Sequence, residues 1–358
     1  MMVPFAGYDR GLLEGIARYA HLHGPWVFYL SGDYPEVPLP TSDSLSGKLT
    51  GLEYISGVVG ATPLPSLRRW GATGVIGRIQ SAKVARKILA AGLPLIGIDS
   101  PHRQIASASP LSRISQVCVD SHQAGRLAAE HFLGLGFRHF AFCGYPGRIW
   151  SQLRQEGFTE LLRETGFACE VYQPVKDKLG LSWQWEQPMV MSWLKSLPKP
   201  VAVMGCNDIR GRQVLAASLL AGLTVPEDVA VVGVDDDHLI CNLSNPPLSS
   251  VALNLDQAGY QAAELLDDLM SGEVQEPRQI TVEPLWVVPR HSSDVIATED
   301  RHVAAVLRFI RDHARQPIGV DDVAKQAGIS RRSLEIRFRR ALGRSIRDEI
   351  QRVRQGQS

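Results

Sequence analysis

Short apolar runs that alternate with amphipathic segments constrain the fold of this chain most. The runs are bounded by Gly, Pro or Asp and are almost continuously apolar, as strands are when both sheet faces are covered. The segments between them repeat apolar residues every three or four positions, as helices with one buried face do. This alternation predicts an α/β fold with parallel sheets built from βαβ units. The predicted strands lie at 74–79, 93–100, 115–120, 138–146, 200–208 and 228–236, and the predicted helices at 9–23, 121–134, 152–165 and 210–221.

Polar residues stand where several of these predicted strands end. They are Asp99, Asp120, the pair Asn207 and Asp208, and the run from Asp235 to Asp237. Ligands of open parallel sheets bind outside the carboxyl ends of the strands. Carboxylates at such positions would hold a hydroxyl-rich ligand, because each accepts several hydrogen bonds. The alternative is that these residues only cap the helices that follow, and the sequence leaves it open.

The sequence contains no clear motif for metal binding, phosphate binding or catalysis. The "DDDH" run (235–238) cannot direct all its side chains at one ion, and "GYPGRI" (144–149) lacks the Lys-Ser/Thr pair of a phosphate loop. No nucleophile-and-base motif is present. We therefore expect no metal, no cofactor and no enzymatic activity.

The location of the protein is predicted from what the chain lacks. It has no apolar run of about 18 residues and no basic-then-apolar signal pattern at the N-terminus. Its five cysteines are widely spaced, and no two of them form a CxxC pair. These features predict a cytoplasmic protein without a membrane partner, in which each cysteine is a small buried apolar residue.

Charge is unevenly distributed along the chain. Residues 299–358 carry 14 Lys and Arg against 8 Asp and Glu, whereas the remaining residues carry 24 against 29. A basic tail on an acidic body predicts that the tail meets a polyanion, although a solvated basic helix face gives the same pattern.

Three stretches of the body have a recognisable pattern: "DSHQAGRLAAEHFLGLGFRHFAFCG" (120–144), "NDIRGRQVLAASLLAGLTVPEDVAVVGVDD" (207–236) and "SSVALNLDQAGYQAAELLDDLMSGE" (249–273). Through them the body resembles the periplasmic-binding-protein-like sensor of LacI/GalR-type repressors. The resemblance implies two lobes around a sugar, and it places Asp120, Arg154, Asn207, Asp208 and Asp235 at that sugar.

Arg154 also fits a sugar site on its own terms. It lies four residues before Phe158 in a predicted helix, and its guanidinium can fork onto ring or hydroxyl oxygens. Trp150 could stack on a sugar face or belong to the core. Tyr8, in the "YDR" of the first loop, is a further candidate ligand residue.

The tail has the order of a DNA-reading module. A predicted helix at 301–315 precedes "VDDVAKQAG" (320–328), and Ser330 is positioned to cap "RRSLEIRFRRAL" (331–342). This order resembles the first half of an AraC/XylS-type helix-turn-helix domain, small and all-α. Early residues of such a second helix point at base edges. The predicted DNA-contacting residues are Ser330, Arg331, Arg332, Ser333, Glu335 and Arg337.

The two parts joined in this order are similar to the regulators of xylose operons. Shared features are "YDR" (8–10), "GYQAAELL" (259–266) and "GISRRSLEIRF" (328–338) after "RFIRDHA" (308–314). The resemblance implies a homodimer that binds a pentose, xylose being the first candidate, and double-stranded DNA. The rival hypothesis is a sugar-binding module without DNA binding.

The expected boundaries follow from the same resemblance. The sensor spans 1–290, with lobe 1 at 1–117 and 249–274 and lobe 2 at 118–248 and 275–290. The lobes are joined by crossings near 115–120, 244–250 and 274–280. A linker at 291–299 leads to a partial DNA-binding domain at 300–358, with its first helix-turn-helix at 320–342.

Two departures from the family pattern carry expectations of their own. Only "MMVPF" stands before the first loop, where a full strand is expected, and no second helix-turn-helix follows residue 354. We therefore expect an exposed apolar stripe (Ile346, Ile350, Val353) on the last helix and weak, largely salt-dependent DNA binding.

Overall fold

The computed structural model describes most of the chain from residue 114 onward and less of what precedes it. No structural statement below concerns Asp99, which lies outside the described residues, or the side chain of Tyr8. The described residues are 7–24, 26–28, 72–77, 86, 89–90, 92–98, 114–174, 183–274, 276–295, 300–313 and 316–355.

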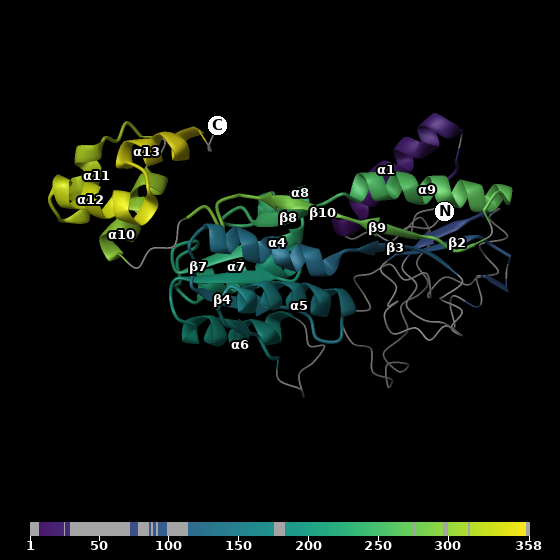
Figure 1. Ribbon diagram of the computed structural model, residues 1–358, viewed down its shortest axis with the longest axis horizontal. Coiled ribbons are helices and arrows are strands. Elements are labelled where there is room, and N and C mark those ends of the chain that lie inside the picture. Colours follow the sequence, from purple (N-terminus) through teal and green to yellow (C-terminus); the bar gives the residue numbers. More distant parts are fainter. Residues whose placement is uncertain are drawn as a thin grey trace.

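The larger sheet of the described chain has six strands in the order β10-β8-β7-β6-β4-β5. Its strands are parallel except β10, which runs antiparallel to β8. Helices α4 and α5 pack on one face, and α6 and α7 on the other (Figure 1). The elements are β4 (His139–Cys143), β5 (Cys169–Val171), β6 (Val201–Gly205), β7 (Val229–Asp235), β8 (Ser249–Leu253), β10 (Pro284–Val288), α4 (Ser121–Gly134), α5 (Ile149–Glu164), α6 (Trp183–Ser196), α7 (Asp208–Leu220) and α8 (His238–Leu243).

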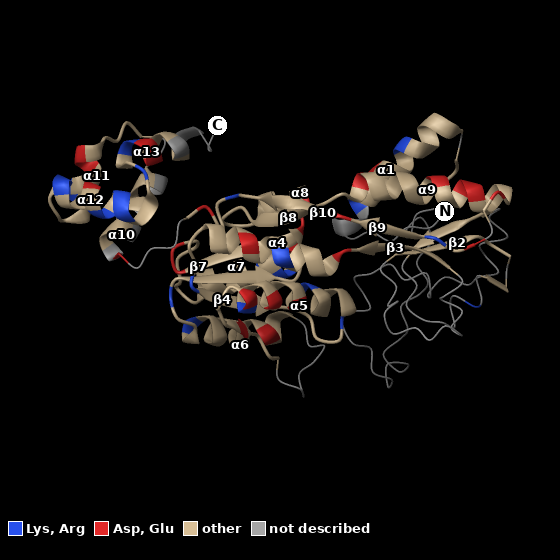
Figure 2. Cartoon of the chain, viewed as in Figure 1, with Lys and Arg blue, Asp and Glu red and all other residues tan. Residues whose placement is uncertain are grey.

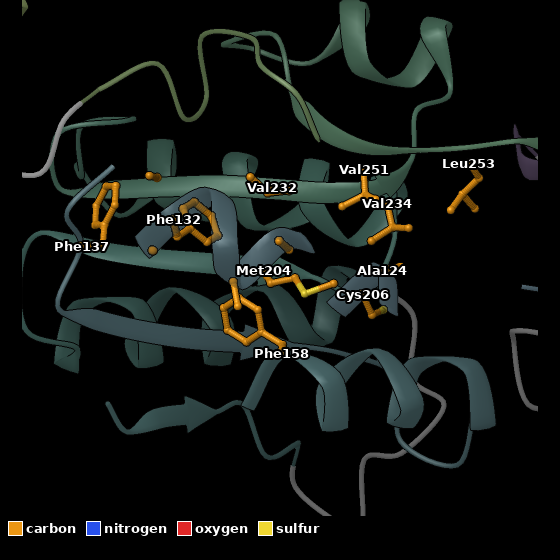
Figure 3. Packing of buried hydrophobic residues seen from close by; sticks show 14 of the residues in the cluster. Ala124, Phe132, Phe137, Phe158, Met204, Cys206, Val232, Val234, Val251 and Leu253 are labelled. Atoms are coloured by element: carbon orange, nitrogen blue, oxygen red, sulfur yellow. The ribbon is translucent and has the colours of Figure 1, made fainter. Parts of the chain in front are cut away.

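Alternation along the strands separates two apolar clusters, one on each face of this sheet. Successive side chains of a strand point to opposite faces. Phe142 and Met204 therefore join Phe132 and Phe158 of α4 and α5, as Figure 3 shows for several of these residues. Their neighbour Val203 joins the cluster that α6 and α7 cover. Both faces are buried, which explains why the strands are almost continuously apolar in the sequence.

The smaller described sheet has four parallel strands in the order β1-β2-β3-β9. Helices α1 and α9 lie side by side against it (Figure 1) and bury Leu12, Ile16, Ala262 and Leu266. The elements are β1 (Val75–Gly77), β2 (Leu95–Ile98), β3 (Ser115–Val119), β9 (Gln279–Val282), α1 (Gly7–His23) and α9 (Leu255–Ser271).

Within the described residues the chain passes between the sheets at three places that lie together. The backbone amide of Asp120 donates to Val282 (3.0 Å), and that of Asn254 donates to Glu283 (3.0 Å). These bonds tie the β3–α4, β8–α9 and β9–β10 junctions into one hinge. We call the two sides lobe 1, with the smaller sheet, and lobe 2, with the larger one.

Only the first crossing lies where the sequence predicts it. The strand at 249–253 was expected in lobe 1, but β8 pairs with β7 and β10 in the larger sheet. The segment 275–282 was expected in lobe 2, but β9 pairs with β3 in the smaller sheet. The second and third predicted crossings are therefore wrong. The physical reason is that an apolar run fixes burial and not the sheet that it joins.

Helices α10 to α13 form a separate group beyond the larger sheet (Figure 1). They bury Val306, Ile310, Leu334 and Phe338 against one another. Their bounds are α10 (Arg301–Asp312), α11 (Val320–Ala327), α12 (Arg331–Leu342) and α13 (Ile346–Gln355). We call residues 300–355 the helical group.

The expectation of an exposed stripe on the last helix is wrong. Ile346, Ile350 and Val353 are all buried, because α13 turns its apolar face toward α10 and α12. Of the helices that the structure describes, none combines the length and the hydropathy of a membrane span.

Candidate functional site

Arg154 is the centre of the polar residues at the carboxyl edge of the larger sheet. Its side chain is only 4% exposed, and Nη2 lies 3.1 Å from Oδ1 of Asp235. Nη1 donates to the carbonyl oxygen of Cys206 at 2.6 Å. Nε is buried and donates to no described protein atom. A buried donor without a protein acceptor is costly, so this guanidinium is ready to bind an oxygen of a ligand.

Close packing of α4 on α5 fixes the position of Arg154. A Cβ added to Gly125 of α4 would overlap the carbonyl oxygen of Arg154, and one added to Gly157 of α5 would overlap that of His122. The two helices approach closely because both positions lack a side chain. Arg154 therefore projects from a helix that cannot shift away from its neighbour.

Asp235 reaches the site because β7 ends in an unusual backbone conformation. Asp235 has φ 111° and Asp236 has φ 50°, the left-handed region that non-glycine residues rarely adopt. Such strain persists only where surrounding contacts hold it, and it gathers at functional sites. Here the amide of Asp236 donates to Ser250 Oγ at 3.1 Å.

Asp208 lies beside Asp235 but is fully buried. Its carboxylate accepts hydrogen bonds from the Asp237 amide (2.7 Å) and from the Ser250 hydroxyl. Burial raises the pKa of Asp208 well above its usual value, and the negative charge of Asp235 raises it further. The contacts of Asp208 support the turn after β7, whereas Asp235 keeps part of its carboxylate accessible.

Two of the predicted site residues are helix caps. Asp120 Oδ1 accepts from the amide of Gln123 (2.9 Å), and Asn207 Oδ1 accepts from that of Arg210 (2.9 Å). Asp237 caps α8 in the same way. The capping alternative is therefore confirmed for these residues. A cap uses one side-chain oxygen, so the carboxylate of Asp120 keeps a second oxygen beside the hinge.

Trp150 packs next to Arg154 and is half-buried. The Arg154 guanidinium carbon lies 5.3 Å from the centroid of the Trp150 ring, and Tyr145 meets that ring edge-on. Tyr8 lies in α1.

Sequence reasoning missed a contact between the two lobes. Arg10 Nη1 of α1 lies 3.4 Å from Asp237 Oδ1. Arg10 belongs to the "YDR" triplet, so that motif was the only available signal. Its partner Asp237 belongs to the acidic run after β7, in which no local pattern distinguishes one carboxylate from the next.

The end of the body, residues 290–295, is tied to lobe 2; we call it the closing segment. Arg290 Nη1 lies 2.8 Å from Oδ1 of Asp236, directly after Asp235. The Ser292 hydroxyl donates to the carbonyl oxygen of Val231 at 2.6 Å. The closing segment therefore packs against β7 and touches the turn that carries Asp235.

A half-buried histidine contacts the same segment. His131 Nε2 lies 2.9 Å from the hydroxyl of Ser293. Burial lowers the pKa of His131 to about 4, since no charged partner offsets the loss of water around the imidazolium.

In the helical group, α11 and α12 are joined by a short turn, as predicted. Gly328, with φ 66°, ends α11, and Ser330 caps α12 by accepting from the amide of Ser333. Leu334 and Phe338 are buried, and the blue segments of α12 in Figure 2 mark its Arg positions. The predicted bounds of this helix, 331–342, and its Ser330 cap are confirmed.

Two of the outward arginines of α12 already have carboxylate partners. Arg331 contacts Asp321 (2.8 Å) and Glu335 (3.0 Å). Arg337 contacts Asp300 at 2.9 Å. Among the described residues, no carboxylate lies within ion-pair distance of Arg332, which is exposed. Ser333 is half-buried.

The described residues contain no group of three metal-ligating side chains. Cys143, Cys206 and Cys241 are buried, and Cys118 and Cys169 are half-buried; none of the five forms a disulfide.

Comparison with protein families matches residues 129–293 to the periplasmic binding protein-like domain. This range covers most of the larger sheet and its helices. The two-lobed α/β architecture with parallel sheets is that of this fold.

Individual relatives extend the match to nearly the whole chain. The xylose operon regulatory protein of Escherichia coli K12 is 28% identical over 343 residues, 95% of this chain and 80% of that protein. The solved structure of the xylose-binding transcription activator XylR superposes with a TM-score of 0.70 at 27% identity, covering 98% of this chain and 84% of that one. The xylose operon regulatory protein of Haemophilus influenzae is 30% identical over 280 residues, 77% of this chain and 71% of that protein. The chain belongs to the family of the xylose operon regulatory proteins.

Proposed function

We propose that this protein is a sugar-responsive DNA-binding transcriptional regulator, with D-xylose as the first candidate sugar. The observation that carries the proposal is the buried ion pair of Arg154 and Asp235, together with Arg154 Nε, which has no acceptor among the described residues. A carboxylate beside a guanidinium offers acceptors and donors together, as vicinal hydroxyls need. The relatives are regulators. The His131–Ser293 contact pairs an imidazole with a hydroxyl, but Ser293 is buried away from solvent, so no catalytic step is proposed.

We propose direct sugar contacts for some of the other predicted ligand residues and an indirect role for Asp208. Asp120 would contact the sugar from the hinge with the oxygen that does not cap α4. Asn207 would use its amide nitrogen, and Trp150 would stack on the ring. Asp208 would act indirectly by holding the turn of Asp235. Tyr8 remains a candidate from α1.

The sugar signal would travel through closure of the lobes. A ligand shifts a conformational equilibrium only when it binds one state more tightly than the other. A sugar held by Arg154 and Asp235 on lobe 2, and by lobe 1 across the hinge, binds only the closed form with both sets of contacts. We propose that closure repositions the helical groups of a cytoplasmic homodimer.

The helical group is proposed to be an AraC-type helix-turn-helix, with α12 in the major groove. The exposed Arg332 supports this role most directly. Arg331 and Glu335 hold each other, and Arg337 is held by Asp300; base contacts by these residues would replace existing ion pairs. Ser330 and Ser333 lie at the start of α12, where helix N-termini approach phosphate or base edges.

A thermal-shift screen of pentoses and hexoses tests the sugar half of the proposal. A ligand that binds only the folded state raises the melting temperature in proportion to the logarithm of its concentration. We expect xylose to give the largest shift. No shift with any sugar of the panel would refute a sugar-responsive regulator.

Binding of duplex DNA across a salt series tests the other half. Each phosphate that a protein neutralises lowers log K by about 0.9 for each unit increase in log salt concentration. A regulator is expected to combine a steep slope with preference for selected over random DNA. A sugar-binding module without DNA function would show a higher melting temperature with sugar. It would not bind duplex DNA even at low salt.

A further inference from the structure

Ile336 is the most outward-pointing apolar side chain of α12. Each residue advances an α-helix by about 100°, so Ile336 lies about 200° from both Leu334 and Phe338. Those two residues are fully buried, whereas Ile336 is 62% exposed. The side chain therefore points almost directly away from the helices that α12 packs on.

Basic residues flank Ile336 along the same face. Arg332 lies one turn before it and Arg340 one turn after it, and both are exposed. Residues four apart are neighbours on a helix surface. The outer face of α12 therefore presents one branched apolar side chain between two guanidinium groups.

An anionic partner with an apolar feature fits this surface. Duplex DNA supplies both, because phosphates flank the major groove and thymine places its C5-methyl group on the groove floor. A purely anionic surface would match Arg332 and Arg340 but would leave Ile336 without a favourable contact. We propose that Ile336 is a specificity-determining residue that reads the C5-methyl group of a thymine; this inference rests on the proposed DNA-binding function.

The test removes the methyl group from the DNA side of the contact, or the branched side chain from the protein side. Duplexes are first selected from a random pool with the full chain, and each thymine of the selected site is then replaced singly by deoxyuridine. This substitution keeps the O4 acceptor and removes only the methyl group. Ile336→Ala removes the apolar partner and keeps a strong helix-forming residue in α12.

The parent chain should bind one or more uracil-substituted duplexes about fourfold more weakly, the effect of exposing one buried methyl group. Ile336→Ala should bind the thymine and uracil forms of that duplex equally. Ile336→Val, which keeps a branched apolar side chain, should retain most of the discrimination. Leu243→Ala, which removes an exposed apolar side chain on α8, should discriminate as the parent does.

Two results would overturn the inference, and they are distinguishable. If the chain selects a site but no thymine methyl matters, or if Ile336→Ala still discriminates, the role of Ile336 is wrong and DNA binding stands. If no duplex is enriched from the pool at low salt, the proposed DNA-binding function fails and the inference fails with it.

Discussion

Arg10 of lobe 1 and Asp237 of lobe 2 form an ion pair across the hinge, with Nη1 3.4 Å from Oδ1. Asp237 also caps α8 and, through its amide, holds the carboxylate of Asp208. The contact therefore links α1 to the turn that carries Asp235. Because its two members belong to different lobes, the contact depends on how the lobes are arranged.

Removal of Arg10 is expected to weaken sugar binding without abolishing it. An ion pair with one exposed partner contributes about 1 kcal/mol or less, so Arg10→Ala should lower the affinity for the best sugar by up to about fivefold. Titration calorimetry measures this change. Arg18→Ala is the matched control, because Arg18 pairs with Asp256 inside lobe 1. Equal affinities of the parent and Arg10→Ala would show that the pair is irrelevant to closure.

Removal of either member of the Arg154–Asp235 pair is expected to weaken sugar binding strongly. Loss of a charge-assisted hydrogen bond costs roughly 1.5–3 kcal/mol, which corresponds to about a tenfold to hundredfold lower affinity for Asp235→Asn or Arg154→Ala. Asp235→Asn is the milder variant, since it leaves a neutral hydrogen-bonding side chain of the same shape.

The control for this experiment is an ion pair that joins α4 to α5. Arg126 contacts Glu164 at 3.0 Å on the surface of lobe 2, so Arg126→Ala should bind sugar as the parent does. Parent-like affinity of Asp235→Asn and Arg154→Ala, both still folded by circular dichroism, would mean that the sugar binds elsewhere.

Acid is expected to destabilise lobe 2 through His131. Its pKa in the folded protein, about 4, lies below the ordinary value of 6.5, so the unfolded state takes up the proton first as pH falls. The stabilisation from neutral His131 is complete above pH 6.5 and is lost progressively toward pH 4. Between pH 7 and pH 5 this group alone should lower the free energy of unfolding by about 2 kcal/mol.

Denaturant unfolding at both pH values, with the parent and His131→Gln, isolates this contribution. The variant should lose less stability between pH 7 and pH 5 than the parent does. His139→Gln, which changes an exposed histidine of the same lobe, should behave as the parent. A pH dependence unchanged in His131→Gln would contradict the assignment.

Arg332 and Arg331 are expected to contribute unequally to DNA binding. Arg332 has no carboxylate partner among the described residues, so Arg332→Ala should weaken binding and reduce the slope of log K against log salt by about 1. Arg331 is held by Asp321 and Glu335, and Arg331→Ala should change the slope less. Arg163→Ala, an exposed arginine of the body, is the control. A larger effect of Arg331→Ala would reverse this ranking.

Periodicity predicted much of this fold correctly. The predicted helix at 121–134 coincides with α4, and that at 331–342 coincides with α12. Both helices have a clear buried stripe and a capping residue, which are local signals. The sequence did not predict that β8 belongs to lobe 2, because pairing with β7 depends on residues far apart in the chain.

The candidate site was predictable in part for the same reason. Asp235 was predicted from its place at the end of a strand, and Arg154 from its place in a helix. The structure brings these two residues together. The contact of Arg10 with Asp237 was not predictable, since it joins two lobes. Nor could the sequence show that Ile346 is buried, because that depends on how α13 turns back onto α10.

The closing segment connects lobe 2 to the helical group through a short stretch of chain. Val295, its last described residue, is buried, and α10 begins six residues later in the sequence at Arg301. A chain of six residues spans at most about 20 Å, so the start of α10 lies within about 20 Å of Val295 in lobe 2. Lobe 2 is thus the fixed base from which the helices are held. In the proposed closure, lobe 1 therefore moves relative to lobe 2 and to the helices that follow lobe 2 in the chain.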